Sequence, residues 1–342
     1  WRIIMLNNSI EKLILGNDLS IDESKQCMDF IMNGEATSAQ IAAFLVSLRI
    51  KGETVGEITG MATSMRNNSL TVPNTSYLVD TCGTGGDGFG TINASTISAI
   101  IAASGGVKVA KHGNRAASSK SGSADVLEGL GVVIDLSPDL VAESIEKTNF
   151  GFMFAQTFHP AMRHVGPTRR ELGIRTVFNF LGPLTNPAKA NAQVLGVSDP
   201  SIGEKMANVL KSFNIEHALI VHGLEGLDEI SVCGPSQIWE VTKEGIKDYQ
   251  IVPEDFGIQR YDINDLRGGE ISDNIVMFQE IIRGKGTAVD FVVLNAAAVL
   301  FVGNKVTSIL EGVELARELI ADGSVTSKLE EIIQTTQSLK YV

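Results

Sequence analysis

The sequence has few cysteines and no apolar run long enough to cross a membrane. Its 342 residues include only three cysteines, and their spacing fits neither a disulfide framework nor a metal finger. The longest apolar stretch, 288–303, is interrupted by polar residues and falls short of the ~18–20 residues that span a bilayer. No signal peptide is visible. We therefore expect a cytoplasmic protein with no membrane partner.

Basic residues are also scarce. The chain has 28 lysines and arginines against 40 aspartates and glutamates, a formal charge of −12. This balance argues against a general nucleic-acid binder. A substrate that carries phosphate is still compatible, because two segments depart from the acidic background. Residues 105–124 contain four basic residues and 150–170 contain three, and neither segment has an acidic residue.

Glycine and apolar residues, by contrast, are plentiful. Glycine occupies 34 positions, and many of them cluster at 83–90 and 105–131, where the backbone must turn tightly or approach a ligand. Hydrophobic residues make up 44% of the chain, enough for a packed core. The length predicts two domains, or one large domain with a small companion.

The first seventy residues predict a small helical domain without strands. Capping-box pairs open two helices, one from Ser20 to Met32 and one from Thr54 to about Met65. Between them, Thr37 or Ser38 opens a helix that ends at Gly52. The polar stretch 67–76 looks like a linker.

From Tyr77 onward, short apolar strands alternate with helices. This order predicts an α/β fold: a small N-terminal helical domain (5–72) and a large α/β domain (77–342) with a central, mostly parallel sheet flanked by helices. Ligands of such sheets bind at the carboxyl ends of the strands. Strands are expected at 78–80, 107–110, 151–155, 193–197, 218–221 and 230–232, and helices at 94–104, 123–130, from 138, 288–301, 308–320 and 326–335.

A glycine-rich segment follows the first of these strands. It reads DTCGTGGDGFG over 80–90 and continues into TINAST, where a helix is expected to begin near Ala94 with Asn93 as its cap. Backbone N–H groups in such a turn and at a helix N-terminus bind phosphate oxygens. The segment also matches a dinucleotide fingerprint, but Lys108 and Lys111 stand where an acidic ribose ligand is expected. We favour a phosphate loop.

Three further segments carry chemistry. The segment 111–125 follows a strand and is rich in hydrogen-bond donors. We interpret His112 as a packed or hydrogen-bonding histidine rather than a catalytic base. In 159–170, one arginine is suited to a substrate carboxylate, whereas Arg163 and Arg170 are interpreted as surface residues. In 221–230, the adjacent carboxylates Asp228 and Glu229 predict a Mg²⁺ site beside the phosphate loop.

Taken together, these motifs resemble the anthranilate phosphoribosyltransferases of tryptophan biosynthesis. The resemblance spans nearly the whole chain. It rests on six motifs in order: Gly83-Thr84-Gly85-Gly86-Asp87, Asn93-x-Ser95-Thr96, Lys111-His112-Gly113-Asn114-Arg115, His159-Pro160 with Arg169, Gly182-Pro183-Leu184-Thr185-Asn186-Pro187, and Gly226-Leu227-Asp228-Glu229.

The resemblance implies a homodimer whose interface lies on the helical domain. It also implies that helices from 160–190 pack back onto that domain and that anthranilate enters at the hinge between the two domains. It implies anthranilate contacts from Gly83, Asn114 and Arg169, and Mg²⁺ ligation, with two ions per subunit, by Ser95, Asp228 and Glu229. It implies phosphoribosyl pyrophosphate contacts from Gly83, Gly86, Asp87, Thr91, Asn93, Ala94, Ser95, Thr96, Lys111, His112, Gly113, Asn114, Arg115, Ala116, Ala117, Ser118, Ser119 and Ser123.

The implied reaction is Mg²⁺-dependent transfer of the 5-phosphoribosyl group to the amine of anthranilate, giving N-(5-phosphoribosyl)anthranilate and pyrophosphate. The sequence departs from the family pattern at two positions. Glu225 stands where Asp is common, which leaves open whether it joins the outer shell of the metal, and Ile92 stands where Phe is common. One alternative is a pyrimidine-nucleoside phosphorylase, which would need no metal pair. Another is a non-catalytic homologue that binds nucleic acid, against which the charge of −12 argues.

Overall fold

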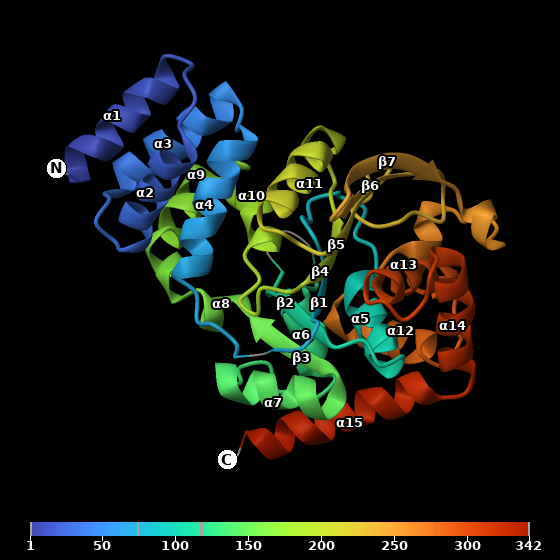
Figure 1. Ribbon diagram of the computed structural model, residues 1–342. Coiled ribbons are helices and arrows are strands. Elements are labelled where there is room, and N and C mark those ends of the chain that lie inside the picture. The colour runs from blue at the N-terminus through green and yellow to red at the C-terminus, as the bar shows by residue number, and fades with distance from the viewer. Residues whose placement is uncertain (1, 74, 117–119, 341–342) are drawn as a thin grey trace.

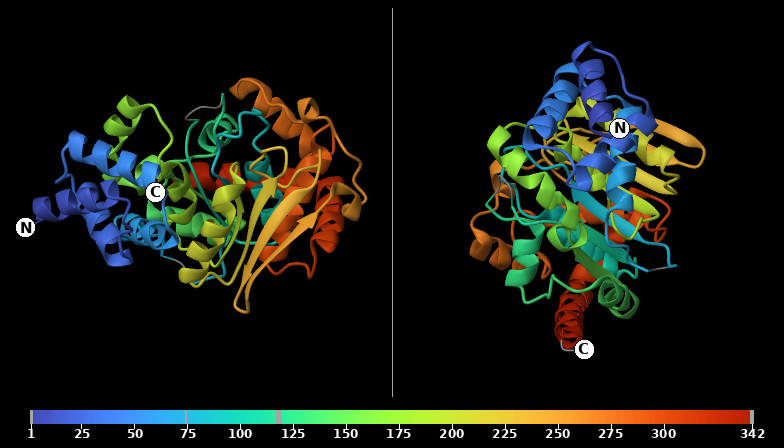
Figure 2. Two further views of the ribbon diagram at one scale, coloured as in Figure 1. Left: turned by 90° about the horizontal axis from the view of Figure 1, so that it is seen from above. Right: turned by 90° about the vertical axis from the view of Figure 1, so that its left-hand side faces the viewer.

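The computed structural model describes residues 2–73, 75–116 and 120–340. Four N-terminal helices form a bundle beside a larger α/β part (Figure 1). Seen from above, this bundle occupies one end of the molecule, and the segments drawn in orange, from residue 250 onward, lie toward the other end (Figure 2, left). The helices of the bundle are α1 (Arg2–Ile14), α2 (Ile21–Met32), α3 (Ser38–Lys51) and α4 (Val55–Asn67).

The helix starts in the bundle follow from local capping. Ser20 and Thr54 accept hydrogen bonds from the third helical residue of α2 and α4, and each partner glutamate bonds back to the cap, as predicted. Thr37 opens α3 in the same way, and Gly52 ends it with φ of +86°. Helix α4 runs two residues beyond the predicted end at Met65.

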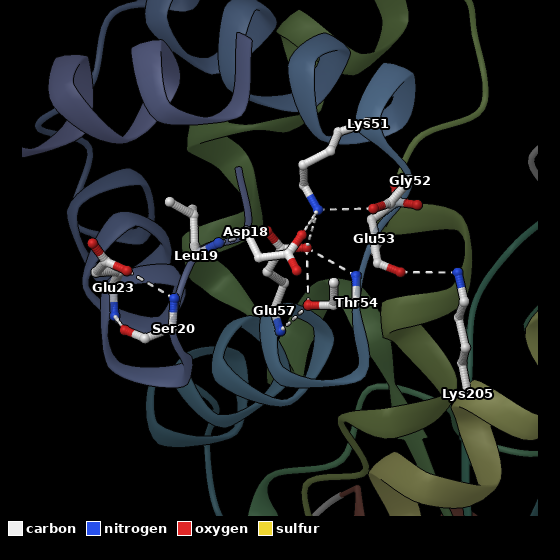
Figure 3. Close-up of polar contacts among 10 residues, drawn as sticks. All are labelled: Asp18, Leu19, Ser20, Glu23, Lys51, Gly52, Glu53, Thr54, Glu57 and Lys205. Carbon is white, nitrogen blue, oxygen red and sulfur yellow. Dashed lines mark hydrogen bonds and ion pairs between the residues drawn. The ribbon is translucent and has the colours of Figure 1, made fainter. Parts of the chain in front are cut away.

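A buried carboxylate fixes the turn between α3 and α4 (Figure 3). Glu57 is fully buried. Its carboxylate accepts hydrogen bonds from the backbone N–H of Leu19 (2.9 Å) and of Thr54 (2.8 Å), and it pairs with the ammonium of Lys51 at 2.9 Å. The carbonyl of the adjacent Glu53 accepts a hydrogen bond of 2.9 Å from Lys205, which lies in the α/β part. The turn is thereby attached to the α/β part.

The α/β part contains one seven-stranded sheet in the order β3-β2-β1-β4-β5-β6-β7. Five strands are parallel, whereas β6 and β7 form an antiparallel hairpin at one edge. The mostly parallel α/β sheet is thus confirmed. The strands are β1 (Val79–Gly83), β2 (Val109–Gly113), β3 (Phe150–Phe154), β4 (Ala192–Gly196), β5 (His217–Gly223), β6 (Ser236–Thr242) and β7 (Gly245–Ile251).

One predicted strand is wrong, and the hairpin was not predicted. Residues 230–232 are not a strand: Ile230 and Val232 are fully buried, but in a loop. The backbone N–H of Ile230 donates to the side chain of Asn295 at 2.9 Å rather than to a neighbouring strand. The apolar run therefore packs a loop against a helix, which hydrophobicity alone does not distinguish from a buried strand.

Helices cover both faces of the sheet. Along β5, Leu219 and Val221 face a core shared with α5 and α13, while Ala218 and Ile220 face the core that includes α11 and the bundle. The helices are α5 (Ala94–Ser104), α6 (Ser123–Gly129), α7 (Pro138–Thr148), α8 (Ala155–Phe158), α9 (Gly166–Leu172), α10 (Phe178–Leu181), α11 (Gly203–Ser212), α12 (Ile271–Ile281), α13 (Val289–Val302), α14 (Ile309–Ala321) and α15 (Ser324–Leu339).

Short 3-10 helices complete the structure. Helices α9 and α10 lie in the segment 160–190, where helices were expected, whereas α8, α11 and α12 were not predicted. Helix α9 packs on α3, and apolar residues from 165–184 join the core of the bundle. Within the described part of the chain, no helix combines the length and the apolar character needed to cross a membrane. The 3-10 helices are Pro160–His164, Gly182–Leu184, Pro200–Ile202, Pro253–Phe256 and Ile263–Leu266.

Candidate active site

The sheet brings the sequence motifs together at the carboxyl ends of its parallel strands. The glycine-rich segment follows β1, the donor-rich segment follows β2, the histidine-arginine segment comes after β3, and the acidic doublet comes after β5. These strands are parallel, so their carboxyl ends lie together. Segments that are up to about 150 positions apart in the sequence therefore border one region.

The glycine-rich loop packs against the acidic doublet. A Cβ atom at Gly83 would lie 2.2 Å from Oδ2 of Asp228, so only glycine fits there. The backbone N–H of Gly85 donates to the same carboxylate at 2.7 Å. Gly85 and Gly86 have φ of +67° and +77°, in the left-handed region that favours glycine. Asp87 accepts a hydrogen bond from the loop itself, from the N–H of Phe89 at 3.2 Å.

Helix α5 begins at the end of this loop. Asn93 occupies its N-cap position, as predicted, but its side chain does not cap the helix. The amide of Asn93 donates instead to the carbonyl of Ser121 at 3.2 Å, which ties the loop after β1 to the loop after β2. Its Oδ1, like Oγ1 of Thr96, is buried with no hydrogen-bond partner in the described part of the chain. Ala94 is buried in the first turn and Thr91 forms an isolated bridge with Arg267.

Lys111 places a cation beneath the start of α5. Its side chain is 1% exposed, and its ammonium donates to the carbonyl of Thr81 at 2.5 Å and to the hydroxyl of Ser95 at 3.2 Å. Burial lowers the pKa of Lys111, and the nearby carboxylate of Asp80 opposes that shift.

The loop after β2 is folded on itself. Arg115, expected to contact phosphate, pairs with Asp125 at 3.0 Å and with Glu128 at 2.7 Å. Asp125 also accepts hydrogen bonds from the backbone N–H of Ala116 at 3.0 Å, and the hydroxyl of Ser123 donates to the carbonyl of Asn114 at 3.3 Å. Three residues with predicted roles, Ala117, Ser118 and Ser119, lie outside the described residues.

The acidic doublet is partly shielded from solvent and carries raised pKa values. Burial raises the pKa of Asp228 to about 7, and the charge of Asp87 adds to the shift. Burial and the charge of Asp228 raise the pKa of Glu229 to about 8. Three carboxylates thus crowd one place, and a cation there would relieve their repulsion. Nowhere in the described residues do three His, Cys, Asp or Glu side chains form a ready-made metal cage. A doublet of this kind fits Mg²⁺, which keeps waters and substrate oxygens as ligands.

Glu225 faces away from this cluster. Its carboxylate accepts a hydrogen bond from the hydroxyl of Ser231. The oxygen of Ser231 in turn accepts from the backbone N–H of Cys233 at 2.9 Å. Glu225 therefore shapes the turn that follows the doublet.

A pocket of about 320 Å³ opens beside the glycine-rich loop. Gly83, Asn114 and Arg169, the three residues expected to contact anthranilate, all line it. The guanidinium of Arg169 lies 5.2 Å from the centre of the Phe178 ring, and burial lowers its pKa. The pocket is large enough for a small aromatic acid and presents one cation to a carboxylate.

Two neutral histidines share this pocket. The rings of His112 and His159 are 4.9 Å apart, and both residues line the pocket. Burial lowers the pKa of His112 to about 3 and that of His159 to about 4. Both imidazoles are therefore uncharged at neutral pH. His164 lies apart from them, where its ring borders Gly34 of the bundle.

Sequence reasoning missed several lining residues. Pro183 belongs to a motif that was recognised but given no role at the site. The others carry no local signal, because each is a single side chain placed by packing. They are Met65, Cys82, Gln156, Met162, Phe178 and Asn179.

Comparisons with known proteins agree with this arrangement. Residues 75–326 match the model described as "Glycosyl transferase family, a/b domain", and 7–69 match "Glycosyl transferase family, helical bundle domain". The anthranilate phosphoribosyltransferase of Acetivibrio thermocellus is 51% identical over 336 residues, covering 98% of this chain and 97% of that protein. That of Dehalococcoides mccartyi is 48% identical over 338 residues, covering 98% and 99%.

Solved structures give the same result. The anthranilate phosphoribosyltransferase of Thermus thermophilus has a TM-score of 0.91 and 45% identity, covering 96% of this chain and 99% of that one. The enzyme from Saccharomyces cerevisiae in complex with PRPP and Mg has a TM-score of 0.91 and 28% identity, covering 97% and 98%. The chain therefore belongs to the anthranilate phosphoribosyltransferase family.

Proposed function

We propose that this chain transfers the 5-phosphoribosyl group from phosphoribosyl pyrophosphate to the amine of anthranilate in L-tryptophan biosynthesis. One observation carries the proposal: the bond of 2.7 Å from the Gly85 N–H to the Asp228 carboxylate. It places the acidic doublet against the phosphate loop, as a metal-dependent pyrophosphate site requires. The names of the relatives and the PRPP and Mg of the yeast structure support the same activity.

The phosphoribosyl pyrophosphate site consists of the loops after β1 and β2. The glycine backbone supplies N–H donors, the start of α5 contributes the positive end of the helix, and Lys111 adds a buried positive charge beneath them. We assign to this site Gly83, Gly86, Asp87, Thr91, Asn93, Ala94, Ser95, Thr96, the segment 111–119 and Ser123. Arg115 reaches a phosphate only by leaving Asp125 and Glu128, so binding and loop rearrangement are coupled.

The anthranilate site is the pocket lined by Gly83, Asn114 and Arg169. Arg169 pairs with the carboxylate of anthranilate, since a guanidinium matches a carboxylate in a bidentate geometry. The neutral rings of His112 and His159 add apolar surface without a competing charge. The substrate enters at the hinge between the two domains.

The metal site is assigned to Ser95, Asp228 and Glu229, with two Mg²⁺ ions per subunit. The raised pKa values of the two carboxyls support a cation here, because it offsets the cost of keeping both ionised. When bound, Mg²⁺ neutralises charge that develops on the pyrophosphate leaving group.

The reaction is a displacement at C1 of the ribose, with inversion expected. The amine forms a bond to C1 and then releases a proton, while the bond from C1 to the pyrophosphate oxygen breaks and both electrons leave with pyrophosphate. An aromatic amine is nucleophilic when neutral, so no strong base is required. Lys111 and the loop N–H groups stabilise the leaving group, and the pocket holds the two substrates together.

We further propose a cytoplasmic homodimer that uses the helical bundle as its interface. Large apolar side chains are exposed there: Ile14 is 62% exposed, Leu15 75% and Ile50 81%. We divide the chain into a helical domain at 5–72, with helices from 160–190 packed on it, and an α/β domain at 77–342. Analytical ultracentrifugation tests the dimer, which the double change Leu15→Glu with Ile50→Glu is expected to dissociate.

The decisive experiment follows the fluorescence of anthranilate. It is expected to fall when phosphoribosyl pyrophosphate and Mg²⁺ are both present, and to stay constant when either is left out or the metal is chelated. Equimolar pyrophosphate is expected as the second product. Phosphorolysis of thymidine or uridine without loss of anthranilate would instead establish a nucleoside phosphorylase. Salt-dependent binding of single-stranded DNA without any turnover would indicate a non-catalytic homologue.

A further inference from the structure

Arg175 lies against the glycine-rich loop, although no sequence motif gave it a role. It sits in the segment between α9 and α10. Its guanidinium donates to the carbonyl of Gly85 at 3.0 Å and to the hydroxyl of Ser198 at 3.3 Å. A longer contact of 3.5 Å reaches the carbonyl of Gly86. A Cβ atom at Gly86 would lie 2.5 Å from the guanidinium, so the side chain covers this turn closely.

Both backbone polar groups of Gly85, the N–H and the carbonyl, thereby have hydrogen-bond partners. Its N–H donates to the carboxylate of Asp228 at 2.7 Å, while its carbonyl accepts from Arg175 and, at 3.0 Å, from the hydroxyl of Ser198. Two successive glycines with positive φ have many alternative conformations. A charged donor on the carbonyls selects one of these conformations and so reduces the ordering that a ligand must otherwise impose.

The same arginine is linked to the helical bundle. The guanidinium of Arg49, in the last turn of α3, donates to the backbone carbonyl of Arg175 at 2.5 Å. The following turn is itself attached to the α/β part by Lys205 through the carbonyl of Glu53 (Figure 3). No carboxylate pairs with Arg49 or Arg175 within the residues that the structure describes. The hydrogen bonds of these two guanidinium groups go to backbone carbonyls and to Ser198. The pKa of Asp199, which hydrogen bonding with Ser201 lowers most, is lowered further by the charge of Arg175.

We propose that Arg175 is a positioning residue for the reaction. It holds the Gly85-Gly86 turn in the conformation that keeps the N–H of Gly85 on Asp228 and directs the N–H groups from Gly86 onward toward pyrophosphate. Through Arg49, Arg175 also makes that conformation depend on the position of the helical bundle. The inference rests on the proposed assignment of the glycine-rich loop to phosphoribosyl pyrophosphate. Arg175 does not line the pocket assigned to anthranilate, so its effect falls mainly on one substrate.

The test separates the KM values of the two substrates. Arg175→Met is expected to raise the KM for phosphoribosyl pyrophosphate about tenfold or more, and to change the KM for anthranilate by less than about twofold. Arg175→Lys, which keeps the charge, is expected to lie between the wild type and Arg175→Met. Arg170→Met is the matched control, since Arg170 is a nearby arginine on α9 with no assigned role, and it is expected to behave as the wild type.

Two further variants keep the test decisive if Arg175→Met does not fold. Arg49→Met removes the link to the bundle. Ser198→Ala removes the second donor to Gly85 together with the hydroxyl that accepts from Arg175. Both are expected to raise the KM for phosphoribosyl pyrophosphate by about threefold. Circular dichroism is expected to show a wild-type fold for these variants.

The inference is overturned if Arg175→Met is folded and changes neither KM, or raises both equally. If Arg175→Met does not fold, unchanged KM values for Arg49→Met and Ser198→Ala overturn it. An inactive wild type would instead contradict the proposed function. An active wild type with an unaffected Arg175→Met contradicts the positioning role alone.

Discussion

The backbone N–H of Ser95 donates a hydrogen bond of 3.2 Å to the carboxylate of Glu229, which lies 134 positions further along the chain. Ser95 is in the first turn of α5, where the positive end of the helix favours an anion. In this structure the anion is the acidic doublet itself. The phosphate loop and the proposed metal ligands are thus parts of one site, and a change in either one should be felt by the other.

The doublet should control the response to Mg²⁺. Asp228→Asn combined with Glu229→Gln removes both anionic ligands, so kcat/KM is expected to fall about 100-fold or more and activity to lose its saturable dependence on Mg²⁺. A Mg²⁺ titration of initial rates measures this. Glu225→Gln is the control, because Glu225 bonds to Ser231 and is expected to leave the titration unchanged. An unaltered titration in the double variant would rule out the assignment.

Arg169 should affect mainly anthranilate. Arg169→Ala leaves a carboxylate in the pocket without its charged partner, so the KM for anthranilate is expected to rise about tenfold or more while that for phosphoribosyl pyrophosphate changes little. Steady-state kinetics with each substrate varied in turn measures the difference. Arg170→Ala supplies the comparison and should resemble the wild type. Equal effects of Arg169→Ala on both KM values would refute the role.

The raised carboxyl pKa values predict a loss of stability as pH rises. Unfolded carboxyls ionise near pH 4, whereas Asp228 and Glu229 have folded pKa values of about 7 and 8. The folded chain therefore holds protons that the unfolded chain releases, and the stabilisation present below pH 4 is lost as pH rises through 7 to 8. His112 and His159 act in the opposite sense, but only below their unfolded pKa of about 6.5.

Urea unfolding of the metal-free chain between pH 6.5 and 8 tests this loss. At pH 6.5 about half of the unfolded imidazoles are still protonated, so the two histidines oppose the loss at the start of this window, but the two carboxyls dominate across it. The wild type is expected to lose stability across it, and the variant with Asp228→Asn and Glu229→Gln to lose less. Identical slopes for the two proteins would contradict the pKa directions.

The buried carboxylate of Glu57 should be essential to the helical bundle. Glu57→Ala leaves Lys51, which is 6% exposed, with only the exposed Asp18 as its partner and frees two backbone N–H groups. The free energy of unfolding is therefore expected to fall by about 2–4 kcal/mol. Glu143→Ala disrupts a pair whose side chains are 43% and 56% exposed and should cost less than about 1 kcal/mol. Urea unfolding followed by circular dichroism compares them. Similar costs would show that the Glu57 network is not a stabilising element.

Local signals explain what the sequence predicted correctly. A capping box joins residues only three positions apart, so Ser20 and Thr54 mark helix starts without knowledge of the fold. The parallel strands are short apolar runs, and all five lie within three residues of their predicted bounds at both ends. The β6–β7 hairpin was missed because its strands are partly exposed and its turn, Lys243-Glu244, lacks the usual glycine or asparagine.

The site was predictable only where several residues form a motif. The glycine-rich loop and the acidic doublet contain enough unusual residues in sequence to be recognised. Arg175 and Ser198 are single polar residues, and their relation to Gly85 exists only after β1 and β4 have paired. The side chain of Asn93 shows the same limit: its position at the helix start was predicted, but its partner is Ser121, on a different loop.

The place of β1 in the sheet has a consequence for the order in which the chain is synthesised. The first strand to emerge lies in the interior of the sheet, between β2 and β4, so one of its edges stays unpaired until residues 192–196 have been made. The doublet at 228–229 is translated later still. A nascent chain thus carries its glycine-rich loop for about 140 residues before the acidic doublet that packs against this loop exists. The unpaired edge of β1 is therefore a surface through which a partly synthesised chain can associate wrongly until β4 has been made.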